Sequence, residues 1–261
     1  MHRMHVLVDL PLMVLGASGF IAGVIWAVPV VVTVMLCIHA IAVIHPRCGW
    51  YLPVHWRLPA GTVDVALTFD DGPNPLVTPQ VLDLLAAAGQ QATFFVIGEH
   101  ARAHPELLRR MRAEGHAIGL HADQHARTSA LWSTARVETD LRACQAAVVA
   151  ATGHATMLFR PPMGLKNPLI GSAAARMGVT TVTWSVRGWD TTQPPLSVWL
   201  KRLYPGLLPR AIVLLHDGHE PGRAADRSGC LLALAALLPE LARRGLRSRA
   251  LTIRASQLAL V

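Results

Sequence analysis

One stretch decides the fold: Val63-Asp64-Val65-Ala66-Leu67-Thr68-Phe69-Asp70-Asp71-Gly72-Pro73. Its first seven residues are mostly apolar and rich in β-branched and aromatic side chains, which predicts a buried strand over Val63–Phe69. Two adjacent carboxylates come next, and then Gly72-Pro73, a dipeptide typical of a turn. By itself this acidic pair is compatible with an ordinary turn, so its meaning depends on the residues at the ends of the other strands.

The chain from this stretch to the C-terminus alternates predicted strands with predicted helices. Further strands are expected at Ala92–Ile97, His116–Leu120, Met157–Phe159, Val179–Ser185, Ala211–Leu215 and Ser248–Ile253. Helices are expected at Thr78–Ala88, Pro105–Glu114, Ser133–Thr152, Asn167–Met177, Leu196–Leu203 and Cys230–Arg244. Glycine follows most of these helices, as is common at helix C-termini. The alternation predicts an α/β fold, a distorted (β/α) barrel of about seven mostly parallel strands.

Side chains able to do chemistry come after most of the predicted strands. They are Asp70 and Asp71; His121 and His125; Arg160 with Pro161, Pro162, Met163 and Gly164; Trp189 and Asp190; and His216. Singly, each has a structural explanation, such as a turn, a surface histidine pair, a proline loop or a buried histidine. Their common position at one end of the predicted barrel favours an active site, because barrel chemistry gathers at the C-terminal ends of strands.

The pair His121 and His125 suits a metal ion, because two histidines four residues apart can point the same way. One added carboxylate gives a two-histidine, one-carboxylate face with open positions for water and a substrate oxygen. A second carboxylate, not bound to the metal, could act as general base on water. A buried arginine would hold that base in its charged form, and a histidine on the far side would protonate a leaving nitrogen.

These residues resemble the polysaccharide deacetylase family, also called the NodB-homology or carbohydrate esterase family 4 domain. The resemblance runs from about Val63 to the C-terminus, and the six residues from Thr68 to Pro73 match the family's first motif in every position. The resemblance implies the distorted barrel fold, hydrolytic deacetylation of a glycan, and a divalent metal cofactor, with zinc as the expected ion.

The resemblance also implies a role for each matching residue. Asp70 would be the general base and His216 the general acid, while Asp71, His121 and His125 would bind the metal. Arg160 would pair with the base, and the backbone N–H of Met163 would help to stabilise the oxyanion. The residues expected to contact the substrate are Pro162, Gly164, Trp189 and Asp190.

Four positions depart from the family pattern. Ala122 replaces a Ser or Thr, Met163 replaces a common aromatic residue, and Arg187 and Thr191 replace the first Asp and the Trp of an Asp-x-x-Asp-Trp motif. That motif's carboxylate region tunes the acid histidine in the family, and whether Asp190 does so here is left open. Because the metal ligands, base and acid are present, we expect these changes to affect the substrate more than catalysis.

The N-terminal region is strongly apolar. The 35 residues from Leu10 to Ile44 contain no Asp, Glu, Lys or Arg, whereas one spanning helix needs roughly 20 apolar residues. We expect residues 1–45 to form a membrane segment, either one long tilted or kinked span or a hairpin of two short helices that turns near Pro29. A cleaved signal peptide fits poorly, because this region is longer than a signal's core. A buried soluble helix seldom runs so far without a charge.

The remaining boundaries and partners are inferred from composition. Residues 46–62 are expected to be a linker at the membrane surface, and residues 63–261 the catalytic domain. The net charge of +8 does not indicate a nucleic-acid partner, because the arginines fall on predicted helices without the interleaved aromatic residues of single-strand binders. Beside a membrane, this charge favours anionic lipid. The four cysteines lack a CxxC pair and predict neither a disulfide framework nor a zinc knuckle.

The sequence therefore predicts a metal-dependent hydrolase that removes an N-acetyl group from a sugar, by cleaving a linear amide bond. Its expected partners are a cell-envelope glycan or lipid-linked saccharide and the lipid bilayer, at the cytoplasmic (inner) membrane of a bacterium. The side of the membrane is left open, since a hairpin would keep the domain in the cytoplasm and a single span would export it. The alternative is a membrane-anchored glycan-binding relative without catalysis. A two-metal phosphoesterase is disfavoured, because it needs further ligands.

Overall fold

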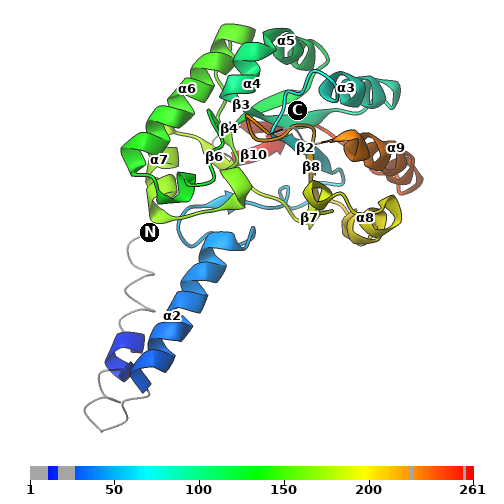
Figure 1. Cartoon of the computed structure of the whole chain (residues 1–261). Coiled ribbons are helices and arrows are strands. Elements are labelled where there is room, and N and C mark those ends of the chain that lie inside the picture. Colours follow the sequence, from blue (N-terminus) through cyan, green and yellow to red (C-terminus); the bar gives the residue numbers. More distant parts are fainter. Residues whose placement is uncertain (1–10, 17–26, 224–225, 255–256) are drawn as a thin grey trace.

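The computed structural model describes residues 11–16, 27–223, 226–254 and 257–261 (Figure 1). Its centre is a curled sheet of eight parallel strands in the order β1-β6-β5-β4-β3-β2-β8-β7. The strands are β1 Val54–His55, β2 Ala66–Asp70, β3 Ala92–Ile97, β4 Ala117–Ala122, β5 Leu158–Phe159, β6 Thr180–Val182, β7 Val186–Arg187 and β8 Ile212–His216. The two edge strands, β1 and β7, do not pair with each other, so the sheet is a half-barrel. The predicted distorted (β/α) barrel is confirmed.

Helices surround the outside of this sheet (Figure 1). They are α3 Thr78–Ala87, α4 Gly98–Ala103, α5 Pro105–Ala113, α6 Thr134–Thr152, α7 Pro168–Met177, α8 Leu196–Leu203 and α9 Ser228–Arg243. Local chemistry sets their ends. In α6, the Ser133 side chain accepts a hydrogen bond from the Arg136 N–H at the start, and Gly153 ends the helix in the left-handed conformation. Short 3₁₀ turns lie at Ser129–Leu131, Pro162–Gly164, Asp190–Thr192 and Tyr204–Gly206.

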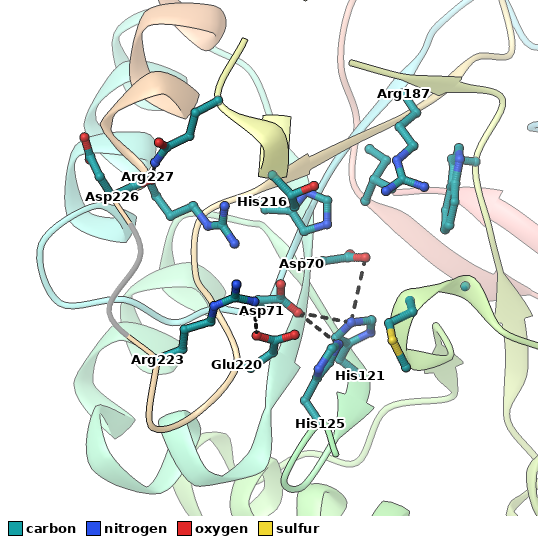
Figure 2. Close-up of a pocket in the computed structure, with 16 residues that line it drawn as sticks. Asp70, Asp71, His121, His125, Arg187, His216, Glu220, Arg223, Asp226 and Arg227 are labelled. Atoms are coloured by element: carbon teal, nitrogen blue, oxygen red, sulfur yellow. Dashed lines mark hydrogen bonds and ion pairs between the residues drawn. The ribbon is translucent and has the colours of Figure 1, made fainter. Parts of the chain in front are cut away.

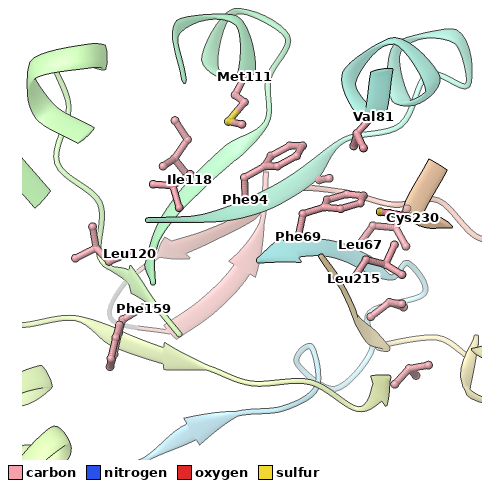
Figure 3. Packing of buried hydrophobic residues seen from close by; sticks show 14 of the residues in the cluster. Leu67, Phe69, Val81, Phe94, Met111, Ile118, Leu120, Phe159, Leu215 and Cys230 are labelled. Atoms are coloured by element: carbon pink, nitrogen blue, oxygen red, sulfur yellow. The ribbon is translucent and has the colours of Figure 1, made fainter. Parts of the chain in front are cut away.

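The hydrophobic core lies between the sheet and these helices (Figure 3). All five residues of β2 are buried, as expected for a parallel strand covered on both faces. Phe69 on β2 and Phe94 on β3 stack with ring centroids 5.1 Å apart. This core fixes the strands whose C-terminal ends carry the reactive side chains.

The structure differs from the sequence prediction in several elements. The strand expected at Val179–Ser185 is divided, because the chain leaves β6, next to β1 and β5, and crosses to β7, next to β8. The last expected strand, Ser248–Ile253, lies outside the eight-stranded sheet: β9 (Leu251–Arg254) pairs antiparallel with β10 (Gln257–Leu260). Helix α4 and strand β1 are additional. The division of the strand and the presence of β1 depend on pairing between distant segments, whereas β9 and β10 are close in sequence.

Helix α2 (Ala27–Ile44) projects from the domain (Figure 1). Its mean hydropathy is 2.6 and 6% of its residues are buried, so by length and composition it is one helix able to cross a membrane. Residues 11–16 are also helical, and a side chain placed at Gly16 would contact Val31 of α2. Pro29 lies in the first turn of α2, a position that tolerates proline. Residues 1–10 and 17–26, and with them the choice between span and hairpin, lie outside the described part of the chain.

A buried lysine joins the end of α2 to the domain. Lys166 is 1% exposed, and its Nζ donates to the backbone carbonyls of Val43 (3.3 Å), His45 (3.0 Å) and Gly164 (3.2 Å). Cations at a helix C-terminus are stabilised by the exposed carbonyls and the helix dipole. The Lys166 N–H also donates to the Val43 carbonyl at 3.0 Å. The C-terminus of α2 is therefore held against the loop after β5.

The stretch 46–62, which we expect to be a linker, packs on the domain. It contains β1, which pairs with β6, and the side chains of Tyr51, Leu52 and Leu58 are buried. The Thr183 hydroxyl donates to the Pro46 carbonyl at 2.7 Å. The division of the chain into segment, linker and domain stays a prediction, but these contacts leave little freedom between α2 and the sheet.

Candidate active site

The register of the sheet brings the predicted catalytic residues together. Asp70 ends β2 and lies directly opposite His216, which ends β8. On the other side of β2, Asp70 pairs with Phe95 of β3, the strand next to β4 and its His121. Because all these strands are parallel, their C-terminal ends meet at one edge, as expected for this fold class.

Three buried side chains could hold a metal ion: Asp71, His121 and His125, whose ligand atoms all lie within 4.8 Å of one another. The Nε2 atoms of His121 and His125 lie 3.2 Å and 3.4 Å from Asp71 Oδ1. This oxygen is buried and forms no hydrogen bond within the described residues. Buried polar atoms are rarely left without a partner. An oxygen and two nitrogens that converge without hydrogen bonding fit a divalent cation such as zinc, with a position left open.

The orientation of His121 favours metal binding. Its Nδ1 lies 2.8 Å from the Arg160 carbonyl oxygen, which can only accept, so Nδ1 carries the proton and donates. In the neutral ring this leaves the lone pair on Nε2, which points toward Asp71 (Figure 2). A carbonyl that fixes the ring in this way is typical of metal-binding histidines.

The charges around His121 also favour a cation. Burial alone would lower the pKa of His121, but the carboxylates of Asp70 and Asp71 outweigh it and raise this pKa. Burial would raise the pKa of Asp71, but the neighbouring His121, His216 and His125 together outweigh burial and hold this pKa well below its usual value. A positive charge at Nε2 is therefore stabilised in this site, and a divalent ion between the three ligands would supply it.

Asp70 is held by a fully buried arginine. Arg160 is 0% exposed, and its Nη1 donates to Asp70 Oδ1 at 2.7 Å and to the Thr68 hydroxyl at 2.8 Å. Its Nε and Nη2 donate to the Val182 and Thr183 carbonyls at 3.1 Å and 3.0 Å. Every nitrogen of the guanidinium is thus engaged, which offsets the cost of burying it. The arrangement orients Asp70 and leaves its Oδ2 4.0 Å from His121 Nε2.

His216 is paired with Asp190. Its Nδ1 lies 2.9 Å from Asp190 Oδ1, and its backbone N–H donates to Oδ2 at 2.7 Å. Burial would lower the pKa of His216, but the Asp190 carboxylate outweighs this effect and raises the pKa to about 9. Asp190 therefore contacts both the ring and the backbone N–H of His216, although Arg187 and Thr191 replace two residues of the family motif.

The loop between His121 and His125 is held by other contacts, because Ala122 has no hydroxyl group. The carboxylate of Asp140, on α6, accepts the backbone N–H groups of Asp123 (2.8 Å) and Gln124 (3.3 Å). Asp123 in turn accepts both Nη groups of Arg102, at 2.6 Å and 3.0 Å. His125 then lies with φ 52, in the left-handed region. Strained residues of this kind cluster at functional sites.

The reactive groups open into a cavity of about 670 Å³. Met163, which has φ 56, and Gly164 line it together with Asp70, Asp71, His121, His125 and His216. The other three predicted substrate contacts lie elsewhere: Pro162 and Asp190 are buried, and Trp189 is 48% exposed beside the cavity wall. Arg160 is fully buried and does not line the cavity.

The cavity includes charged residues that the sequence motifs do not single out. Glu220, Arg223 and Arg227 line it from the loop after His216. Arg187 and Thr191, two of the departures from the family pattern, line it as well. In the sequence, many charged residues follow His216-Asp217-Gly218, and this pattern could have indicated that the loop lines the site. The Asp140 contact has no local signal, because it depends on how α6 packs beside β4.

Comparisons with known proteins agree with this geometry. Residues 57–182 match the sequence model of the polysaccharide deacetylase family. A chitooligosaccharide deacetylase of Bradyrhizobium sp. (strain ANU 289) is 39% identical over 193 residues, covering 71% of this chain and 88% of that protein. A peptidoglycan-N-acetylglucosamine deacetylase of Bacillus cereus is 37% identical over 199 residues, covering 74% of this chain and 89% of that protein.

Solved structures show the same likeness. A peptidoglycan N-acetylglucosamine deacetylase, crystallised with a naphthalenyl N-hydroxybenzamide, superposes with a TM-score of 0.70 at 28% identity, covering 76% of this chain and 90% of that one. A family 4 carbohydrate esterase from Streptomyces lividans, in complex with acetate, gives a TM-score of 0.63 at 28% identity, covering 73% and 93%.

Proposed function

Because the chain belongs to the polysaccharide deacetylase family, we propose that it removes the N-acetyl group from an N-acetylated sugar with the help of a divalent metal ion. One observation carries the proposal: His121 and His125 converge on Oδ1 of Asp71. This oxygen is buried and has no hydrogen-bond partner among the described residues. The oxygen and nitrogen ligands suit zinc. A bound divalent ion would polarise the acetyl carbonyl and make water a better nucleophile.

The protein's own residues supply the remaining steps. Asp70, oriented by Arg160, takes a proton from the attacking water. His216, kept protonated by Asp190, gives its proton to the departing amine nitrogen. These two groups end the neighbouring strands β2 and β8, and both line the cavity. The backbone N–H of Met163 is the candidate donor to the oxyanion.

The substrate class is inferred from the relatives and from α2. The relatives are named for chitooligosaccharide and for peptidoglycan N-acetylglucosamine, which supports an N-acetylated glycan. Helix α2 is exposed, apolar and long enough to span a bilayer, which supports a location at the bacterial cytoplasmic membrane. Together they favour a cell-envelope glycan or a lipid-linked saccharide as substrate.

The decisive test uses the purified full chain and an N-acetylated oligosaccharide. Acetate release should require a divalent metal, stop with chelator and return with zinc. In Asp70→Asn, we expect the rate to fall about 100- to 10,000-fold, because a general base contributes that much, while the bound metal measured by mass spectrometry stays near the wild-type amount.

Asp83→Asn serves as the matched control, since this carboxylate lies on α3, is 67% exposed and pairs with Arg110 outside the cavity. Wild-type rates in Asp70→Asn would refute the assignment of the base. Metal binding and glycan binding without any acetate release from the wild type would favour the alternative, a membrane-anchored glycan-binding relative.

A further inference from the structure

One arginine of the cavity has no hydrogen-bond or ion-pair partner among the described residues. Among the arginines that line the cavity, Arg223 pairs with Glu220 at 3.0 Å and Arg227 donates to the Gly218 carbonyl at 2.5 Å. Arg187, which ends β7, forms no hydrogen bond or ion pair within the described residues, and its Nε is buried without a partner. A half-buried guanidinium in this state favours an anion from outside the protein.

Two aromatic rings hold Arg187 in place. Its guanidinium carbon lies 3.8 Å from the centroid of the Trp189 ring and 5.5 Å from that of Trp184. Stacking occupies a face of the planar group and leaves its N–H edges free, and these edges match the paired oxygens of a carboxylate or phosphate. Arg187 is therefore oriented in advance for such a ligand.

The position of Arg187 relates it to the reaction. It lines the same cavity as Asp70, His216 and Thr191, and Figure 2 shows it on the opposite side of Asp70 from Arg223. Burial lowers the pKa of Arg187 although Asp190 and Asp70 counteract the effect, and an arginine remains charged in proteins. The motif that this stretch resembles begins with an aspartate at this position, so the resemblance implies a reversed local charge beside Asp70 and His216.

We propose that Arg187 makes this cavity selective for an N-acetylated saccharide that carries an oxyanion group, a phosphate or a carboxylate, next to the reacting sugar. This inference rests on the proposed deacetylase function and specifies its substrate class. Neutral chitin-like sugars are then the poorer substrates, and the anion supplies the missing partner of Arg187.

The test separates binding from turnover. The affinities of Asp70→Asn full chain for N-acetylglucosamine 1-phosphate, N-acetylmuramic acid and N-acetylglucosamine are measured by calorimetry, and the wild-type kcat/KM is measured on the same three sugars. We expect roughly tenfold or greater preference for at least one anionic sugar, as a charge-assisted hydrogen-bonded pair provides. Comparison of N-acetylglucosamine 1-phosphate with N-acetylmuramic acid shows whether the cavity prefers a phosphate or a carboxylate.

Variants at position 187 decide the role of the arginine. The preference should disappear in Arg187→Gln and reverse in Arg187→Asp, which restores the family residue. It should persist in Arg109→Gln, a matched control at an exposed position of α5. The inference would be overturned by equal affinity for charged and neutral sugars, or by failure to bind the anionic sugars at millimolar concentration. It would also be overturned if the preference survived in Arg187→Gln. Binding with the expected preference but no acetate release would refute only the deacetylase function.

Discussion

At the residue scale, Asp190 is the main influence on the charge of His216, the proposed general acid. The carboxylate outweighs the effect of burial and raises the pKa of His216 to about 9, so the imidazolium persists through neutral pH. Asp190→Asn removes this charge, and the pKa of His216 then falls. We expect the alkaline limb of the kcat profile to move to lower pH by about 1–3 units. The measurement is a pH-rate profile beside the Asp83→Asn control, and an unmoved limb would contradict this role.

The residues that could be predicted from sequence are those that form contiguous motifs. Asp70 and Asp71 were identifiable because they come after a buried strand and precede Gly72-Pro73, and the structure places both in the cavity. The roles assigned to the individual side chains stay predictions. Trp189 has a contact that its motif does not indicate, because its indole lies against the Arg187 guanidinium, 3.8 Å from the ring centroid, and its predicted contact with substrate stays a prediction. Only the folded chain reveals which neighbour a side chain contacts.

At the scale of elements, α6 supports the proposed metal site through Asp140. Asp140→Ala removes the acceptor for the N–H groups of Asp123 and Gln124, so the loop that carries His125 loses its support. We expect about 10- to 100-fold weaker metal binding, as for other residues that orient metal ligands, with the fold retained. Competitive zinc titration against a chromogenic chelator measures this loss.

A suitable control for Asp140→Ala is Glu138→Gln, on the same helix, whose carboxylate pairs with Arg142 and Arg176 away from the metal ligands. If both variants bind zinc like the wild type, the loop does not depend on Asp140.

The elements themselves were predictable where local signals are strong. Leu196–Leu203 and Ala92–Ile97 have the expected bounds, and Gly153 and Gly178 end α6 and α7 in the left-handed conformation. The division between β6 and β7 was not predictable, because Thr183 and Ser185 have different partners: the Thr183 N–H donates to His55 and the Ser185 N–H to Ile212. Such a choice depends on the closure of the whole sheet and not on neighbouring residues.

At the scale of the whole molecule, the Lys166 side chain links the C-terminus of α2 to the domain through hydrogen bonds. Lys166→Met retains an unbranched side chain but removes the donors to Val43, His45 and Gly164. We expect about 1 kcal/mol lower stability and faster protease cleavage within residues 45–62 of the detergent-solubilised chain. Lys201→Met, at an exposed site on α8, is the control. Unchanged cleavage in Lys166→Met would show that other contacts hold the junction.

The same junction has a consequence for which sugars can be reached. Gly164 accepts a hydrogen bond from Lys166 and also lines the cavity, so a single side chain links the cavity wall to the end of α2. With α2 in a bilayer, as proposed, the cavity cannot swing outward on a tether and stays at one height above the lipid headgroups. A long polymer would then be modified only where it passes that height, giving a regular position of free amines near the lipid end. A freely tethered enzyme would instead leave them scattered along the chain.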